Sequence, residues 1–209
     1  MRSTHVASIL AGLALAACGC STRQPMRGQE VTGLDRKLST FAFIEEGDLV
    51  TFVVGTKAAR YRDGSAYMPV EIALANVGVK TLLVTREAFT LVDEQGNRYP
   101  AASPTELIRG YEFLDLDRTS FAELGSILTS KFAAFQRYPS QLSPTRELFA
   151  DTAGVSTVVR DNVSLPKFGY FIDYVYFPKP STGIKGHTFD LFLSSASLPD
   201  PVFVKFAVE

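Results

Sequence analysis

The chain has 209 residues, of which 46% are hydrophobic and 21% charged, with a formal net charge of −1. This composition is typical of a globular fold and excludes a globally disordered chain. The near-zero net charge argues against non-specific binding to nucleic acid or to an anionic lipid surface. Sixteen phenylalanines and eight tyrosines, with no tryptophan, favour strands over helices because aromatic side chains fit a pleated surface.

The first 18 residues have the organisation of a bacterial export signal. Arg2 supplies a positive charge, and residues 6–16 form an uncharged, mostly apolar run of about eleven residues, the length of a signal-peptide core. A membrane-spanning helix needs about 20 apolar residues, so this run is too short to span. A buried N-terminal helix is the alternative, but it would have polar residues at a 3.6-residue period, and this run has few.

The run ends in Leu15, Ala16, Ala17 and Cys18, which resemble the lipobox of bacterial lipoproteins. In that family the signal peptide is cut before the cysteine, whose thiol receives a diacylglyceryl group and whose amine is often acylated, for example with palmitate. Two or more acyl chains anchor a protein stably, since each buried methylene contributes about 0.8 kcal/mol. The resemblance implies that Cys18 is lipidated, that the three preceding residues are recognised by the signal peptidase, and that residues 1–17 are removed.

The residues that follow refine this assignment. Cys20 is a rival lipid site, but the large apolar residue of the motif is missing before it. Gly19 stands where aspartate is associated with retention in the inner membrane, so the resemblance favours the periplasmic face of the outer membrane in a Gram-negative cell. Residues 18–37 are then the lipidated cysteine and a flexible polar tether with a typical span of about 20–25 Å, and residues 38–209 are the globular domain.

Both cysteines of the chain lie in the N-terminal segment. The globular domain consequently has neither a disulfide nor a cysteine metal ligand. About 190 mature residues can fold without either, because a domain of about 150 residues already buries about 70% of its unfolded surface.

Short strands separated by turn signals account for most of this domain. Residues 67–75 alternate in polarity, and four apolar side chains share one face, opposite Glu71: Met68, Val70, Ile72 and Leu74. A polar, glycine-containing turn at 93–97 joins residues 88–92 to a return strand that starts at Arg98. Further strands are expected at residues 49–54, 82–84, 155–159, 169–177, 188–193 and 202–208.

Residues 101–150 interrupt the β pattern with helical signals. Residues 103–106 are a capping box with proline at the first helical position, and residues 120–123 are a second capping box. Apolar residues then recur at helical spacing and predict a helix over 121–136 that docks on the sheet: Phe121, Leu124, Ile127, Leu128, Phe132 and Phe135. An exposed groove for a partner is the less favoured interpretation of this stripe.

Eight or nine short strands without alternating helices predict a mainly β fold, a two-sheet sandwich with a helical insertion at about 101–150. Residues 67–100 resemble the core hairpins of immunoglobulin-like domains in uncharacterised bacterial lipoproteins, on a pattern of seven positions: Asn76, Gly78, Phe89, Leu91, Asp93, Gly96 and Tyr99. The resemblance covers about half of the chain. It implies an immunoglobulin-like β-sandwich and brings no known activity.

The residues for catalysis or metal binding are sparse. His187 is the sole histidine after the signal segment, so a Ser–His–Asp triad or a zinc site would depend on it, and its position predicts a solvated turn. Ser164 and Lys167 match the S-x-x-K spacing of penicillin-recognising enzymes, but in a connection between strands. Asp115 and Asp117 lack the rest of a calcium loop and predict a solvated acidic turn. No metal, cofactor or catalytic residue is expected.

The strand at 169–177 has aromatic side chains on both faces. Tyr170, Tyr174 and Tyr176 share one face, where they would stack on a sugar or a protein partner if that face were exposed. The favoured interpretation is that the helical insertion covers this face and buries the tyrosines.

These features together predict a lipid-anchored, non-catalytic protein of the bacterial cell envelope with a role in binding, assembly or structural support. Its partners are the membrane, through the lipid anchor, and an envelope protein; nucleic acid is not expected. The alternatives are an envelope hydrolase with an unrecognised site and an accessory or chaperone subunit of an envelope complex.

Overall fold

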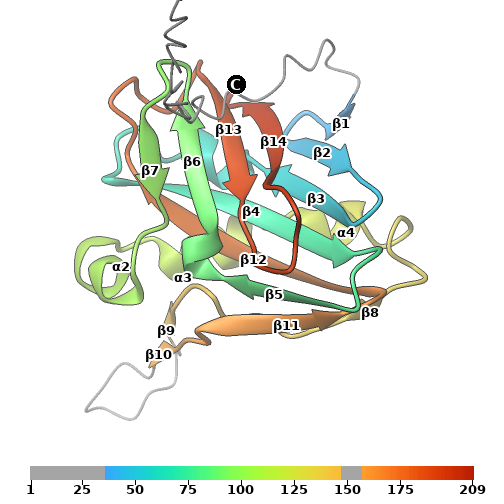
Figure 1. The fold of residues 1–209 in the computed structure, drawn as a ribbon. Helices are drawn as coiled ribbons and strands as arrows, with labels where there is room; N and C mark the ends of the chain where they lie inside the picture. Colours follow the sequence, from blue (N-terminus) through green and yellow to red (C-terminus); the bar gives the residue numbers. More distant parts are fainter. Residues whose placement is uncertain (1–35, 147–156) are drawn as a thin grey trace, which may run out of the picture.

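A computed structural model describes residues 36–146 and 157–209 (Figure 1). The predicted signal peptide, Cys18 with its recognition residues, and almost all of the tether lie outside the described residues. The described part is mainly β, as the sequence predicts, and it has four short α-helices.

One sheet forms the centre of the fold. Its strand order is β1-β2-β3-β4-β12-β8, and all pairs are antiparallel except β12 with β8. The two longest strands lie side by side in its middle. Its strands are β1 (Lys37–Ser39), β2 (Ala42–Glu46), β3 (Val50–Gly55), β4 (Tyr67–Asn76), β12 (Gly169–Pro178) and β8 (Gln136–Arg137).

A second, four-stranded sheet of order β14-β13-β6-β7 packs against one face of the first. Its strands are β6 (Phe89–Asp93), β7 (Arg98–Pro100), β13 (Thr188–Leu193) and β14 (Val202–Ala207). Two short pairs complete the β-structure: β5 (Thr81–Thr85) with β11 (Asn162–Pro166), and β9 (Thr145–Arg146) with β10 (Thr157–Val158). A 3₁₀ turn, η2 (Arg86–Ala88), leads into β6.

The main hydrophobic core fills the space between the two sheets. The alternation in β4 is confirmed, because its four apolar side chains all belong to this core with none of their surface exposed: Met68, Val70, Ile72 and Leu74. Rings from both sheets meet here, such as Phe52 with Phe89 at 6.0 Å between ring centres. At about 25 cal/mol per Å² of apolar surface, this burial is the main source of stability.

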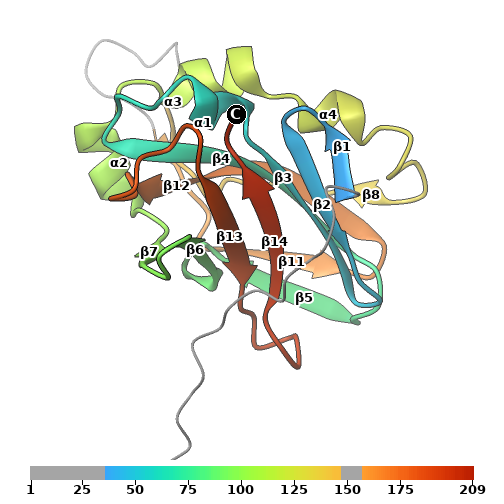
Figure 2. The same ribbon diagram turned by 90° about the horizontal axis from the view of Figure 1, so that it is seen from above.

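The other face of the central sheet is covered by helices, as Figure 2 shows. α1 (Lys57–Arg60), α2 (Pro104–Gly110), α3 (Leu114–Leu116), the π-helix η3 (Asp117–Phe121) and α4 (Leu124–Ile127) lie over it. We call residues 101–144 the cover segment. Two smaller apolar clusters join it to the sheet, one around Leu124, Leu128 and Phe132 and one around Leu107, Tyr111 and Leu114.

The helical expectations are met in part. The capping box at Ser103 is confirmed, because its side chain accepts from the backbone N–H of Glu106 and the Glu106 carboxylate accepts from the backbone N–H of Ser103. The predicted helix over 121–136 is wrong, because only α4 is α-helical and turns follow it. Glycine, serine and threonine at positions 125, 126, 129 and 130 are poor helix formers, yet the apolar side chains still reach the sheet.

Candidate functional site

The three tyrosines of β12 do not form an exposed aromatic surface. Tyr174 and Tyr176 are 3% and 1% exposed, and Tyr170 is half-buried, with its ring centre 5.0 Å from that of Phe132. The prediction of an interaction surface at Tyr174 and Tyr176 is therefore wrong, because the cover segment lies on this face. The favoured interpretation, burial beneath the helical insertion, is confirmed.

Between the central sheet and the cover segment, buried polar and charged groups form a polar layer beside the two apolar clusters. At one end of it, Asp117 is fully buried. Both Nε and Nη2 of Arg62 contact its Oδ1, at 3.0 and 2.8 Å, and the Tyr111 hydroxyl donates to its Oδ2. Burial raises the pKa of Asp117, while Tyr111 and Arg62 act in the opposite direction. The expected solvated turn at Asp115 and Asp117 is thus wrong for Asp117.

Two aromatic rings enclose the Arg62 guanidinium, whose carbon lies 4.2 Å from the ring centre of Phe113 and 5.1 Å from that of Phe121. Such contacts stabilise a cation most where water is excluded. Because a buried ion pair loses hydration on both sides, it is stable only with further hydrogen bonds such as that from Tyr111. Arg62 is consequently held rigidly, and it joins the loop after α1 to the π-helix.

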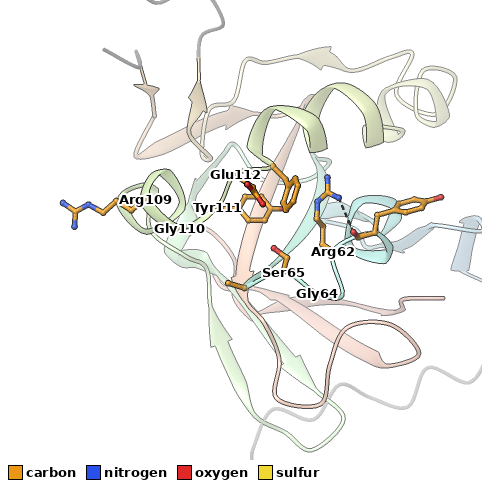
Figure 3. A pocket seen from close by; sticks show the side chains of 10 residues that line it. Arg62, Gly64, Ser65, Arg109, Gly110, Tyr111 and Glu112 are labelled. Carbon is orange, nitrogen blue, oxygen red and sulfur yellow. Dashed lines mark hydrogen bonds between the residues drawn. The ribbon is translucent and has the colours of Figure 1, made fainter. Parts of the chain in front are cut away.

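A hollow of about 600 Å³ opens beside this ion pair, and we call it the first hollow. It lies between the loop after α1 and the loop after α2 (Figure 3). Nη1 of Arg62 donates to the carbonyl of Tyr61 at 3.2 Å, while Arg109 extends away from the hollow. The aromatic part of the wall includes Tyr61, which is 56% exposed and stacks on Phe121 with ring centres 4.9 Å apart.

A second hollow, of about 270 Å³, lies on the other side of the π-helix. Glu71 and Tyr174, which are direct partners in the pairing of β4 with β12, form part of its wall. Oε2 of Glu71 accepts from the backbone N–H groups of Glu123 and Leu124, at 2.9 and 3.2 Å. Burial raises the pKa of Glu71 to about 7, despite these two hydrogen bonds.

Arg118 and Asp173 form another part of the wall of the second hollow. Nη1 of Arg118 lies 3.1 Å from Oδ1 of Asp173 and donates to Ser143. Asp173 also accepts from the side chains of Ser140 and Ser143 and from the backbone N–H groups of Leu142 and Tyr174. This carboxylate is therefore saturated with donors, and its role is to fix the cover segment to β12.

The segment between the two hollows is a π-helix, η3. Its Asp117 forms the ion pair with Arg62, and its Arg118 forms the ion pair with Asp173. Single π-turns are rare and are found frequently at functional sites. Perturbed carboxyl groups in a hollow are a further mark of such sites. Sequence reasoning identified none of Arg62, Glu71 or Asp173 as site residues, because their partners come from segments 30 to 55 positions away.

The other residues considered for chemistry lie elsewhere. Nδ1 of His187 is 3.6 Å from Oε2 of Glu94, near the start of β13. Ser164 is an exposed residue of β11, not the start of a helix. Among residues 36–146 and 157–209, no three His, Cys, Asp or Glu side chains are grouped so as to hold a metal ion.

Comparisons with known proteins give little further information. No protein-family model matches the chain, and no curated protein matches it significantly. Among solved structures, it is similar to a Bacillus subtilis protein provisionally described as a lipoprotein (ycdA), with 12% identity and a TM-score of 0.40. The match covers 78% of this chain and 38% of that one, so the chain spans less than half the length of that protein.

In the part of the chain that the structure describes, no helix has both the length and the apolar character needed to cross a bilayer.

Proposed function

We propose that this chain is a lipid-anchored protein of the bacterial cell envelope whose domain binds an envelope partner without catalysis. The single observation that supports the binding role is the first hollow. It has a volume of about 600 Å³, and the exposed aromatic side chain of Tyr61 forms part of its wall. Exposed aromatic rings beside a rigid arginine are typical of binding surfaces. Anchoring rests on the sequence Leu15-Ala16-Ala17-Cys18 and its resemblance to a lipobox.

We further propose that the domain is immunoglobulin-like. In that fold the chain passes repeatedly between two antiparallel sheets. Here β4 and β12 are neighbours in one sheet, and β6, β13 and β14 are neighbours in the other, so the chain crosses between sheets after β4 and again after β12. This order supports the proposal, with the cover segment as an addition between β7 and β11.

The anchor is tested by Cys18→Ala. We expect the variant protein to leave the membrane fraction and to appear in the soluble fraction of the envelope, because the acyl chains are its attachment. Immunoblots of separated inner and outer membranes would also test the outer-membrane assignment of the wild type. Retention of Cys18→Ala in membranes would contradict the lipid anchor.

The binding role is tested by a photocrosslinking amino acid at position 61 in intact cells. We expect one defined crosslinked envelope protein from this position. Position 83 is the control, because Leu83 is a comparably exposed side chain (43%) on the short β5–β11 pair, and we expect no crosslinked protein from it. Equal crosslinking from both positions, or none from position 61, would count against the first hollow as the binding site.

One observation favours an envelope hydrolase as a second candidate. Glu71, with a pKa of about 7, stands in the second hollow and has the protonation behaviour of a general acid. Against this, its Oε2 is occupied by two backbone donors. Loss of the protein's cellular function in Glu71→Gln, with folding and crosslinking from position 61 intact, would favour the hydrolase.

A further inference from the structure

One of the two arginines that line the second hollow has no ion-pair partner among the described residues. Arg118 is paired with Asp173. Arg137 also lines the hollow, is exposed, and has no carboxylate within ion-pair distance among the described residues. Guanidinium groups bind carboxylates with two parallel hydrogen bonds. This end of the hollow is therefore suited to an anionic group.

Other residues that line the second hollow offer hydrogen bonds to neutral polar groups. The hydroxyl of Tyr174 is buried and has no hydrogen-bond partner among the described residues, although the residue lines the hollow. Leaving a buried hydroxyl unpaired is unfavourable, and a ligand hydroxyl bonded to it would remove this penalty. Glu71, directly across the strand pair, adds a carboxyl group that donates or accepts according to its protonation.

The volume limits the size of the ligand. About 270 Å³ lies just below the range of about 300–1,000 Å³ usual for ligand pockets, so it accommodates a molecule of monosaccharide size. We propose that the second hollow binds a small hydroxylated carboxylic acid, with its carboxylate on Arg137 and Arg118 and its hydroxyl groups on Tyr174 and Glu71. This site is distinct from the first hollow and does not depend on the function proposed for it.

The test is a calorimetric titration of the full-length protein in detergent with D-glucuronate, with D-glucose as the neutral analogue and acetate as the carboxylate without hydroxyls. We expect glucuronate to bind at least tenfold more tightly than either analogue. Arg137→Gln should lower the affinity for glucuronate at least tenfold, whereas Arg98→Gln, an exposed arginine of β7, should leave it unchanged.

Tyr174→Phe separates binding from folding. It removes only the unpartnered hydroxyl, so the ligand-free protein should be at least as stable as the wild type while its affinity for glucuronate falls severalfold. No glucuronate binding, equal binding of glucose, or an Arg137→Gln affinity equal to that of the wild type would each overturn the proposal. Crosslinking from position 61 is unaffected by these outcomes, so the two proposals fail separately.

Discussion

Glu71 is the residue whose ionisation opposes folding most clearly. Its pKa rises from 4.5 to about 7 because burial removes water from the carboxylate. The folded protein therefore holds a proton that the unfolded chain releases between these two values. It follows that this residue's contribution to stability is most favourable below about pH 4.5 and is lost as the pH rises through 7.

We expect Glu71→Gln to reduce the loss of stability between pH 5.5 and 8.5. The difference between the two pKa values corresponds to about 3 kcal/mol in total, of which about 2 kcal/mol falls between pH 5.5 and 8.5, and glutamine cannot ionise. Urea unfolding at both pH values measures the effect. Glu112→Gln, at an exposed position, should keep the wild-type pH dependence. Parallel pH profiles for wild type and Glu71→Gln would contradict the assignment.

The Arg62–Asp117 pair predicts a strong coupling between two substitutions. Arg62→Met leaves the buried Asp117 carboxylate without its cation and should lower the free energy of unfolding by about 3–5 kcal/mol. Adding Asp117→Asn removes that charge, so the double variant should be more stable than the sum of the single effects predicts. Denaturant unfolding of all four proteins completes the cycle, and strict additivity would show that the ion pair is not the cause.

At the scale of elements, α2 has the clearest local determinant. The Ser103 side chain accepts a hydrogen bond from the backbone N–H of Glu106, and the Glu106 carboxylate accepts one from the backbone N–H of Ser103. Ser103→Ala should therefore lower the free energy of unfolding by about 1 kcal/mol. Thr105→Ala, at an exposed position of the same turn, serves as the control. A loss of the same size in both variants would show that the cap is not responsible.

The turn after β4 depends on a close approach of two backbone segments. A Cβ atom at Gly78 would stand 2.5 Å from the carbonyl oxygen of Asp48, whereas one at Gly64 would meet nothing within 4 Å. We expect Gly78→Ala to destabilise the protein by about 1–3 kcal/mol, as overpacking does, and Gly64→Ala to have little effect. Thermal unfolding of both variants tests this difference, and equal midpoints would contradict it.

The sequence was informative where the signal is local. The alternation of residues 68–74 placed the β4 side chains on the correct faces, and the Ser103 capping box placed the start of α2. Prediction from the sequence failed where the structure of a segment depends on contacts with residues far away in the chain. β2 and β11 were not predicted, since they are short and are defined by pairing with β3 and β5. Asp117 was predicted to lie in a solvated turn, because nothing local identifies the segments that bury it.

At the scale of the whole molecule, the central sheet has two different surroundings. One face meets the main apolar core, and the other meets two smaller apolar clusters with the polar layer beside them, beneath the cover segment. The polar layer contains Glu71, Asp117 and Asp173, each held by donors from the cover segment or from α1 and its following loop. The cover segment is therefore the part of the fold whose attachment responds most to pH and to charge substitutions.

The placement of the cover segment has one more consequence, for association between copies of the chain. β12 is the longest strand next to an edge, and β8 pairs with only two of its residues. Beyond β8, Ala102 of the cover segment donates its backbone N–H to the carbonyl of Tyr176, and the backbone N–H of Tyr174 donates to the Asp173 carboxylate. With these groups occupied, β12 offers fewer free backbone groups to the strand of a neighbouring molecule, which limits edge-to-edge aggregation.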